Sequence, residues 1–282
     1  MAWTRWMLGL GLATALGCQS FPIFTGNADS KNDKEFAALG APTKNSLRVS
    51  QFVFHADFEL AKAQPLFKEL SNLREQVFKE LQLPPSTNLV QVYLFEDREK
   101  YEQYMKAKYP DLPKRRAFFV AQPKRIGGAE DLLVYTYWGE RINQDLRHEL
   151  THAMLHSVLK DVPLWLDEGL AEYFEMPPAW NGVNYQHVEN LRTANVQFNL
   201  DRLEKLNDVQ QMTPVEYRES WAWTHLMLRT TPQAKQTLLA YLQELRSNNR
   251  PSPLRSRLAQ VHSAPEEALS RHVATLELGR EK

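Results

Sequence analysis

The sequence is poor in cysteine, in surplus charge and in long apolar runs, and each shortage excludes a class of protein. Cys18 is the only cysteine, so neither an intramolecular disulfide nor a cysteine-clustered zinc site can form. Any metal must therefore be held by histidine and carboxylate side chains. The 34 Lys+Arg residues equal the 34 Asp+Glu residues in number, so the basic surplus typical of nucleic-acid binding is missing. We expect no nucleic-acid partner.

An uncharged apolar run lies at the N-terminus, from Trp6 to Gly17, behind Arg5. At about 12 residues it is too short for the roughly 20 that a membrane-spanning helix needs, and it is typical of an export signal. The run ends at Cys18, and Ala15-Leu16-Gly17-Cys18 resembles a bacterial lipobox, although Leu16 lies two positions before the cysteine instead of three. This resemblance implies that residues 1–18 are a lipoprotein-type signal peptide.

The lipobox resemblance also implies that Cys18 is acylated. The protein would then be exported and anchored by lipid to a membrane of the cell envelope, on its periplasmic or extracytoplasmic face. Two acyl chains or more anchor a protein stably, whereas one does not. Ordinary signal-peptidase cleavage and an uncleaved anchor are the alternatives.

The rest of the chain divides into a tether and one folded domain. Residues 19–46 mix Gly, Asn, Ser, Asp and Lys without a lasting apolar period, which predicts a flexible tether. From residue 47 the pattern is regular, and 43% hydrophobic residues with 13 Phe, 10 Tyr and 7 Trp are enough for a large core. We therefore expect a folded domain over 47–282.

The folded part begins with strand signals and continues with helical ones. Alternating or β-branched runs predict strands at 47–58, 89–97, 116–122 and 132–138, in a mixed sheet of about four strands within 47–139. Helical spacing marks 59–83 and 98–109 between them. After residue 139 the predicted helices are 141–159, 163–175, 185–206, 214–229, 233–246 and two short ones near the end. Strands first and helices later indicate an α+β fold, with a mainly helical part at 140–282.

A metal-binding motif lies on the helix predicted from residue 141. His148-Glu149-Leu150-Thr151-His152 is an H-E-x-x-H sequence. Residues four apart share a helix face, so His148 and His152 can aim at one point while Glu149 flanks it. A catalytic zinc takes three protein ligands and leaves a position for water. The next helix supplies a candidate third ligand, Glu168.

The H-E-x-x-H sequence followed by W-L-x-E-G-x-A-x-Y (Trp165 to Tyr173) is similar to the gluzincins, the thermolysin and aminopeptidase type of zinc metallopeptidase. More narrowly, it resembles the peptidase-MA-like domains of bacterial lipoproteins, many of unknown function. The resemblance implies one Zn²⁺ per chain held by His148, His152 and Glu168. It also implies a carboxylate, Glu172, that hydrogen-bonds a zinc-binding histidine. The spacing to Glu168 is shorter than in thermolysin, so the loop between the two helices must be tight.

The activity implied by the resemblance is hydrolysis of a peptide or protein substrate. In this mechanism the metal lowers the pKa of a water, and Glu149 takes its proton and passes it to the leaving amine. Gluzincins also use a Tyr or His from a later helix to bind the oxyanion. Tyr217 and His225 are the candidates, and the resemblance favours Tyr217. The alternative is that Tyr217 is a core residue and His225 a residue on a helix face.

The gluzincin resemblance also bears on substrate binding. The run 132–138 corresponds to the edge strand that pairs with extended substrates in gluzincins, although an ordinary sheet strand fits it equally. No amine-binding motif of the aminopeptidases precedes His148, which disfavours aminopeptidase action.

Three further residues near the motif have other interpretations. His156 continues the four-residue series but lies about 12 Å from His148 along a straight helix, so we predict a core or surface histidine. Asp167 could compete with Glu168 as the ligand, although it faces about 100° away. Glu175 is predicted to be a solvated charge.

Two functions other than peptide hydrolysis stay open at this point. The chain could be a non-catalytic lipoprotein that uses the gluzincin fold for binding or assembly, with a structural or vestigial zinc. The intact Glu149 favours an enzyme, because degenerate relatives usually lose this glutamate. The chain could also hydrolyse a non-peptide amide, such as one in a cell-wall component, since the metal chemistry is shared.

Overall fold

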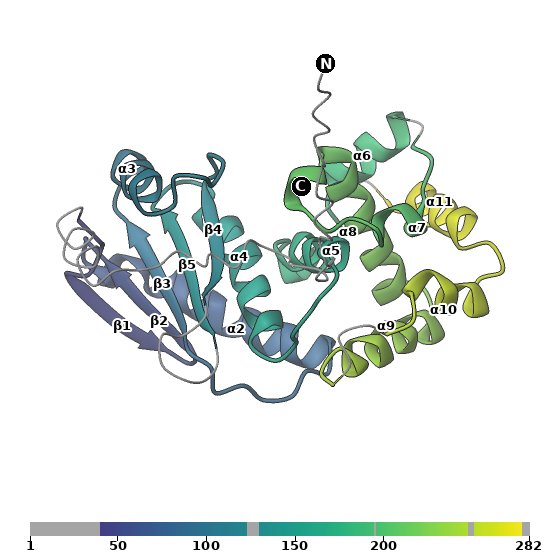
Figure 1. Ribbon diagram of the computed structural model, residues 1–282, viewed down its shortest axis with the longest axis horizontal. Coiled ribbons are helices and arrows are strands. Elements are labelled where there is room, and N and C mark those ends of the chain that lie inside the picture. The colour runs from purple at the N-terminus through teal and green to yellow at the C-terminus, as the bar shows by residue number, and fades with distance from the viewer. Residues whose placement is uncertain (1–39, 123–129, 195, 248–250, 278–282) are drawn as a thin grey trace, which may run out of the picture.

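The computed structural model describes residues 40–122, 130–194, 196–247 and 251–277 (Figure 1). The predicted signal peptide, the lipidation site Cys18 and most of the predicted tether lie outside these residues. Within them, no helix combines the length and the apolar character that a membrane span requires.

The first half of the described chain forms one mixed sheet, and its five strands have the order β1-β2-β3-β5-β4. The strands are β1 (Asn45–Val49), β2 (Phe52–Ala56), β3 (Val90–Phe95), β4 (Ala117–Gln122) and β5 (Asp131–Tyr137). The β2, β3 and β5 strands are parallel, whereas β1 and β4 pair antiparallel at the two edges. With the helices that follow, this sheet confirms the predicted α+β fold.

The sheet has one strand more than predicted because residues 47–58 are a hairpin and not a single strand. The chain reverses at Ser50, which has the left-handed φ of 57°, and Val49 then pairs with Phe52. The alternation of apolar residues runs through both arms, and no glycine marks the turn, so the pattern reads as one strand. The β1 strand begins at Asn45, two residues inside the predicted tether.

Of the two readings left open for the strand at 132–138, an edge strand that pairs with substrate or an ordinary sheet strand, the second is correct. β5 lies between β3 and β4, where Val134 pairs with Val92 on one side and Phe119 on the other. The chain returns antiparallel after β4, so β4 covers the outer side of β5. The edge strand beside the helical half is therefore β4.

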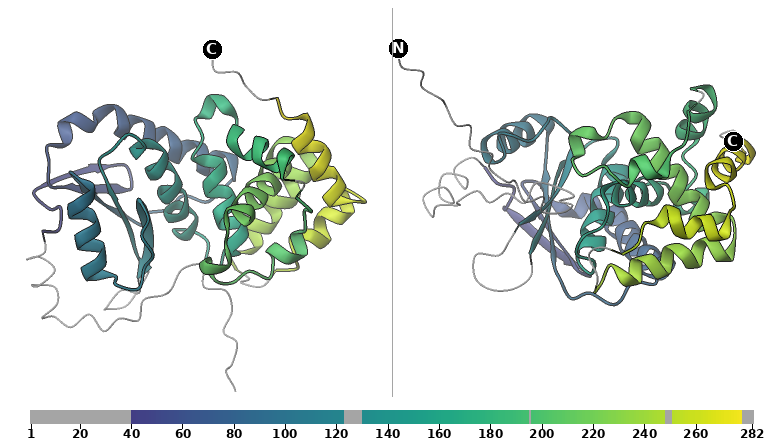
Figure 2. Two further views of the ribbon diagram at one scale, coloured as in Figure 1. Left: turned by 90° about the horizontal axis from the view of Figure 1, so that it is seen from above. Right: turned by 45° about the vertical axis from the view of Figure 1, so that its right-hand side comes forward.

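Helices cover both faces of the sheet and then form the second half of the molecule (Figures 1 and 2). α3 (Arg98–Lys108) packs on one face with Phe95, Phe118 and Tyr135, while α2 (Gln64–Glu80) and α4 (Ile142–His156) share the larger core on the other. The remaining helices are α5 (Leu164–Phe174), α6 (Tyr185–Thr193), α7 (Leu200–Leu203), α8 (Pro214–Arg229), α9 (Pro232–Glu244), α10 (Leu254–Val261) and α11 (Pro265–Thr275), with short 3-10 turns at η1 (Leu60–Ala63), η2 (Pro178–Trp180) and η3 (Val209–Gln211).

The helix predicted over 185–206 is two helices. α6 ends at Thr193, and α7 starts again after Asn199, whose side chain accepts a hydrogen bond from the backbone N–H of Arg202. Asparagine is a preferred helix N-cap because it satisfies such a donor. The apolar period continues across the break, which is why the pattern suggested one helix.

α5 is the central helix of the molecule, and it lies between the sheet half and the C-terminal helices (Figure 1). All its residues except Glu172 are buried. A Cβ atom at Gly169 would lie 2.5 Å from the backbone oxygen of Ser220 on α8, so only glycine fits at this helix crossing. α8 itself begins at a capping box in which Thr213 and Glu216 satisfy each other's backbone donors. These contacts fix the position of α5, and with it the residue before Gly169, Glu168.

Candidate metal centre

The candidate site lies in a cleft of about 900 Å³ between the sheet half and the helical half. Its walls come from the start of β4, from α4, from the end of α5, from α6 and from α8. His148, Glu149 and Tyr217 all line this cleft. Two helices distant in sequence, α4 and α8, thus bring these predicted site residues to one opening.

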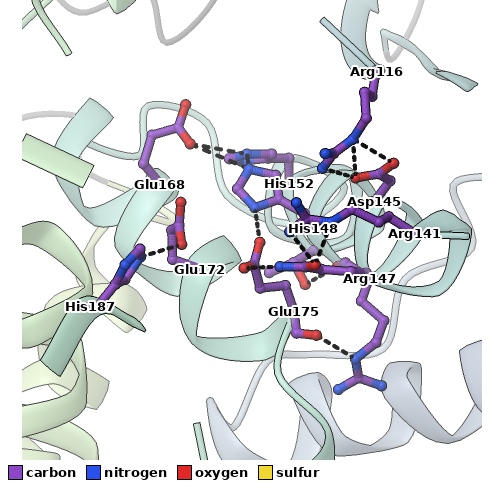
Figure 3. A network of polar contacts seen from close by, with 12 residues as sticks. Arg116, Arg141, Asp145, Arg147, His148, His152, Glu168, Glu172, Glu175 and His187 are labelled. Carbon is purple, nitrogen blue, oxygen red and sulfur yellow. Dashed lines mark hydrogen bonds and ion pairs between the residues drawn. The ribbon is translucent and has the colours of Figure 1, made fainter. Parts of the chain in front are cut away.

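The three predicted metal ligands meet at one point (Figure 3). The Nε2 atoms of His148 and His152 are 3.2 Å apart. Glu168 Oε2 lies 3.4 Å from His148 Nε2 and 3.6 Å from His152 Nε2. A zinc ion with bonds of about 2.0–2.1 Å in tetrahedral geometry would separate its ligand atoms by about 3.3–3.4 Å. The triangle of ligand atoms therefore has the dimensions of a zinc site.

The hydrogen bonding of the three side chains also favours a cation at this point. Both Nδ1 atoms face a carboxylate, at 2.9 Å for His148 and 3.0 Å for His152, so the two Nε2 atoms are left to face each other and Glu168. Within the described part of the chain, neither carboxylate oxygen of Glu168 accepts a hydrogen bond, although both are buried. Two imidazole nitrogens and a buried carboxylate that converge on one point are costly unless protons or a metal cation lie between them. The residues therefore fit a bound zinc ion.

The carboxylates that hold the two histidines are Asp167 and Glu175. Asp167 Oδ2 lies 3.0 Å from both His152 Nδ1 and His156 Nε2. Glu175 Oε2 lies 2.9 Å from His148 Nδ1, and its Oε1 accepts a hydrogen bond from Gln144 at 2.6 Å. A carboxylate on Nδ1 fixes the imidazole tautomer that leaves Nε2 free to bind a metal.

Two predictions from the sequence, for Glu172 and Glu175, are corrected by these contacts. Glu172 was expected to hold a metal-binding histidine, but its Oε2 lies 2.7 Å from His187 Nε2 on α6 (Figure 3). Glu175 was expected to be solvated, yet it is buried and contacts His148. Asp167, the disfavoured rival to Glu168, is not in the ligand triangle and contacts His152 at Nδ1. His156 is not in the ligand triangle, as predicted.

The sequence spacing of Glu175 agrees with its position beside His148. Glu175 lies seven residues after Glu168, two helical turns along the same face. α4 and α5 run antiparallel, since the start of α5 contacts His152 and His156 whereas its end contacts His148 and Arg147. The histidine earlier on α4 therefore meets the carboxylate later on α5.

Burial and the neighbouring charges shift the pKa values of this cluster in opposite directions. Burial alone would lower the pKa of His152, but Asp167 and Glu168 raise it to about 10. Burial would raise the pKa of Glu168, but the two histidines lower it to about 2. Burial would also lower the pKa of His148, but the neighbouring glutamates outweigh this effect and raise it. In the metal-free protein the histidines are therefore protonated against ionised carboxylates, and a metal must displace these protons.

Glu149 differs from the other acids of the site because its carboxylate has no hydrogen-bond or ion-pair partner among the described residues. No described residue forms a hydrogen bond or an ion pair with its carboxylate, which lines the cleft. Burial raises the pKa of Glu149, and the positive charges of His148 and His152 oppose this effect. A carboxylate with a raised pKa, open to the cleft beside the metal ligands, is placed to exchange a proton with a bound molecule.

The two candidate oxyanion donors lie in different places. Tyr217, on the first turn of α8, lines the cleft, and its hydroxyl accepts a hydrogen bond from Arg115 at 3.2 Å. His225 is buried two turns further along α8, where its Nδ1 lies 2.8 Å from His272 Nε2 and its ring packs against Trp221. Of the two residues, only Tyr217 is near the predicted metal ligands.

Comparison with known families identifies one match. A family model described as "Protein of unknown function (DUF1570)" matches residues 144–253, from the first turns of α4 to the residue before α10. The match covers less than half of the chain but includes His148, Glu149, His152, Glu168 and Tyr217. None of the curated proteins matches the chain.

Proposed function

We propose that the protein is a zinc-dependent peptidase whose metal is held by His148, His152 and Glu168. The observation that carries this proposal is the ligand triangle: two imidazole nitrogens and a carboxylate oxygen converge at 3.2–3.6 Å, each histidine held from behind by a carboxylate. His148 of this triangle and the neighbouring Glu149 line a cleft of about 900 Å³, whereas a structural zinc site is closed by a fourth protein ligand.

The residues around the triangle have distinct roles in this proposal. A bound zinc ion would supply Lewis acidity, which lowers the pKa of a water and polarises the substrate carbonyl. Glu149 accepts a proton from the attacking water and returns it to the leaving amine. Tyr217 donates its hydroxyl proton in a hydrogen bond to the oxygen that becomes negative in the transition state. Asp167 and Glu175 keep both imidazoles in the orientation that binds the metal.

The edge strand β4 supports a peptide as the substrate. Its inner side pairs with β5, and its outer side has no strand partner in the described sheet. Phe119 on β4 packs against the rings of His152 and His156, so this edge runs directly past the metal ligands. An extended peptide could add to such an edge through backbone hydrogen bonds.

The site is tested first by the zinc content of the purified protein, measured by elemental mass spectrometry. We expect about one zinc per chain in the wild type and far less in Glu168→Ala, because two histidines alone leave the site one ligand short. Asp161→Ala, at an acidic residue in the loop before α5, is the control and should keep its zinc. A wild type that binds no zinc when it is supplied would support the non-catalytic binding protein instead.

Catalysis is tested by Glu149→Gln, which keeps the shape of the side chain and removes its basicity. We expect normal zinc content and no measurable cleavage of a fluorogenic peptide library by this variant. Equal cleavage by wild type and variant would remove Glu149 from the mechanism. A parallel digest of purified cell wall separates the two substrate classes, because a cell-wall amidase would release fragments there and leave the peptides intact.

The cellular location is a separate proposal, which rests on residues 1–18. We propose that the protein is exported and lipid-anchored through Cys18. Metabolic labelling with a palmitate analogue should mark the wild type and leave Cys18→Ala unlabelled.

A further inference from the structure

One hydrogen bond joins the two halves of the molecule across the cleft. The guanidinium of Arg115 donates from Nη2 to the Tyr217 hydroxyl at 3.2 Å, over a sequence separation of 102 residues. Arg115 lies two residues before β4, in the sheet half, and Tyr217 lies on α8, in the helical half. Both side chains line the cleft that His148 and Glu149 also line.

The direction of this hydrogen bond determines where the proton of the Tyr217 hydroxyl can point. An arginine only donates, so the tyrosine oxygen is the acceptor and its own proton points elsewhere. No described residue accepts that proton. The hydroxyl therefore offers its proton to the cleft.

The charge of Arg115 is also available at this point. Arg116, the next residue, is neutralised by Asp145, with its Nη2 2.6 Å from Oδ1. In the described part of the chain no carboxylate lies within ion-pair distance of Arg115. A guanidinium without an ionic partner polarises the hydroxyl that it contacts, and this makes the hydroxyl a stronger donor.

We propose that Arg115 is a positioning residue: it orients the Tyr217 hydroxyl so that its proton meets the developing oxyanion of the substrate. This inference rests on the proposed peptidase function. The proton stays on Tyr217 throughout, and Arg115 acts only through this hydroxyl, which it orients and polarises. Burial raises the pKa of Tyr217 to about 12 and Glu168 adds to this effect, while Arg115 opposes it, so the contact also makes the hydroxyl a better donor.

The kinetic test is a double-mutant cycle on the zinc-loaded full chain, with a peptide that the wild type cleaves. Loss of an oxyanion donor costs about 10²–10³ in kcat, so we expect about that loss for Tyr217→Phe and about 10–100-fold for Arg115→Ala, with KM changed less than about threefold. In the Tyr217→Phe background, Arg115→Ala should cost less than about threefold further. Arg115→Lys should restore part of the activity. Equal losses from Arg115→Ala in both backgrounds would overturn the proposal, because Arg115 would then act independently of Tyr217.

The matched control is Lys114→Gln, which removes one positive charge at the exposed neighbouring residue without touching Tyr217. It should leave kcat within about twofold of the wild type, because Lys114 does not line the cleft. A loss in Lys114→Gln as large as in Arg115→Ala would show that only the net charge of the region matters.

A second readout needs no substrate. Tyrosine labelled with ¹³C at the ring carbon that bears the hydroxyl gives one NMR signal per residue, and Tyr217→Phe identifies the signal of Tyr217. Arg115→Ala should shift this signal and raise the pKa of the phenol, while Lys114→Gln leaves both unchanged. An unchanged Tyr217 signal in Arg115→Ala would overturn this inference alone, whereas a wild type that cleaves no peptide would contradict the proposed function.

Discussion

One carboxylate oxygen of Asp167 contacts two histidines. Its Oδ2 lies 3.0 Å from both His152 Nδ1 and His156 Nε2, and the side chain is fully buried. Burial would raise the pKa of Asp167, but the two histidines outweigh this effect and lower it. A negative charge is therefore held directly behind a metal-binding imidazole, and it increases the basicity of that ligand.

We predict that Asp167→Asn and Glu175→Gln each weaken zinc binding. Loss of a carboxylate behind a ligating histidine typically costs about 10–100-fold in metal affinity, and competition with a fluorescent zinc indicator measures it. Glu172→Gln is the matched control: its carboxylate pairs with His187, so zinc affinity should stay within about threefold of the wild type. A larger loss in Glu172→Gln than in Glu175→Gln would restore the role first expected for Glu172.

At the residue scale, the sequence predicts the ligands better than their partners. His148 and His152 are fixed by helical spacing alone, and Glu168 follows from the motif resemblance. Glu172 and Glu175 share one helix face, and spacing does not say which of them reaches His148. That choice depends on how α4 crosses α5 and on His187, which comes from α6 and engages Glu172.

The contact between α5 and α8 leaves no room for a larger side chain at Gly169. We predict that Gly169→Ala lowers the free energy of unfolding by about 1–3 kcal/mol, because the new methyl group would meet the Ser220 carbonyl at 2.5 Å and force the helices apart. Denaturant unfolding measures the loss, and zinc affinity should fall with it since Glu168 is the neighbouring residue. Gly139→Ala is the control, where the nearest atom is 3.4 Å away on the Tyr137 ring. Equal stability of the two variants would show that α8 moves aside at little cost.

At the element scale, local patterns locate most helices and strands. They fail where no glycine, proline or capping residue marks the end of an element. α8 is predicted at its observed bounds because Thr213, Pro214 and Glu216 mark its start. The turn at Ser50 and the end of α6 lie within continuous apolar patterns. The edge position of β4 depends on long-range pairing, which no local pattern encodes.

The molecule as a whole has a second histidine cluster, which ties the C-terminal helix to the core. His225 on α8 and His272 on α11 face each other at 2.8 Å between ring nitrogens. Burial lowers the pKa of His225 to about 3, with His272 adding to the effect, and burial lowers that of His272 to about 4. Both rings are therefore neutral in the folded protein at neutral pH.

This cluster predicts a loss of stability in acid. As the pH falls below about 6.5, the two histidines of the unfolded chain take up protons while those of the folded chain do not, so the unfolded state binds more protons. The free energy of unfolding should therefore decrease from about pH 6.5 towards about pH 4, and the cluster should have no effect above about pH 7.5. Urea unfolding at several pH values measures this slope.

The variant His272→Gln isolates this contribution from that of the metal ligands, which titrate as well. It keeps an amide that can hydrogen-bond His225 and removes one titrating ring. The dependence of stability on pH should become shallower in the variant, and parallel curves for the two proteins would rule out the cluster as the cause.

The three predicted ligands lie on consecutive helices, from His148 to Glu168, although the domain extends over some 230 residues. The sheet, by contrast, closes through pairings between distant segments, which form slowly because loop closure costs entropy. The helical pair α4 and α5 can therefore assemble its ligand set before the sheet is complete. A zinc ion that arrives early would join the two helices by a local link, and the order of folding events would then depend on when the chain first encounters metal.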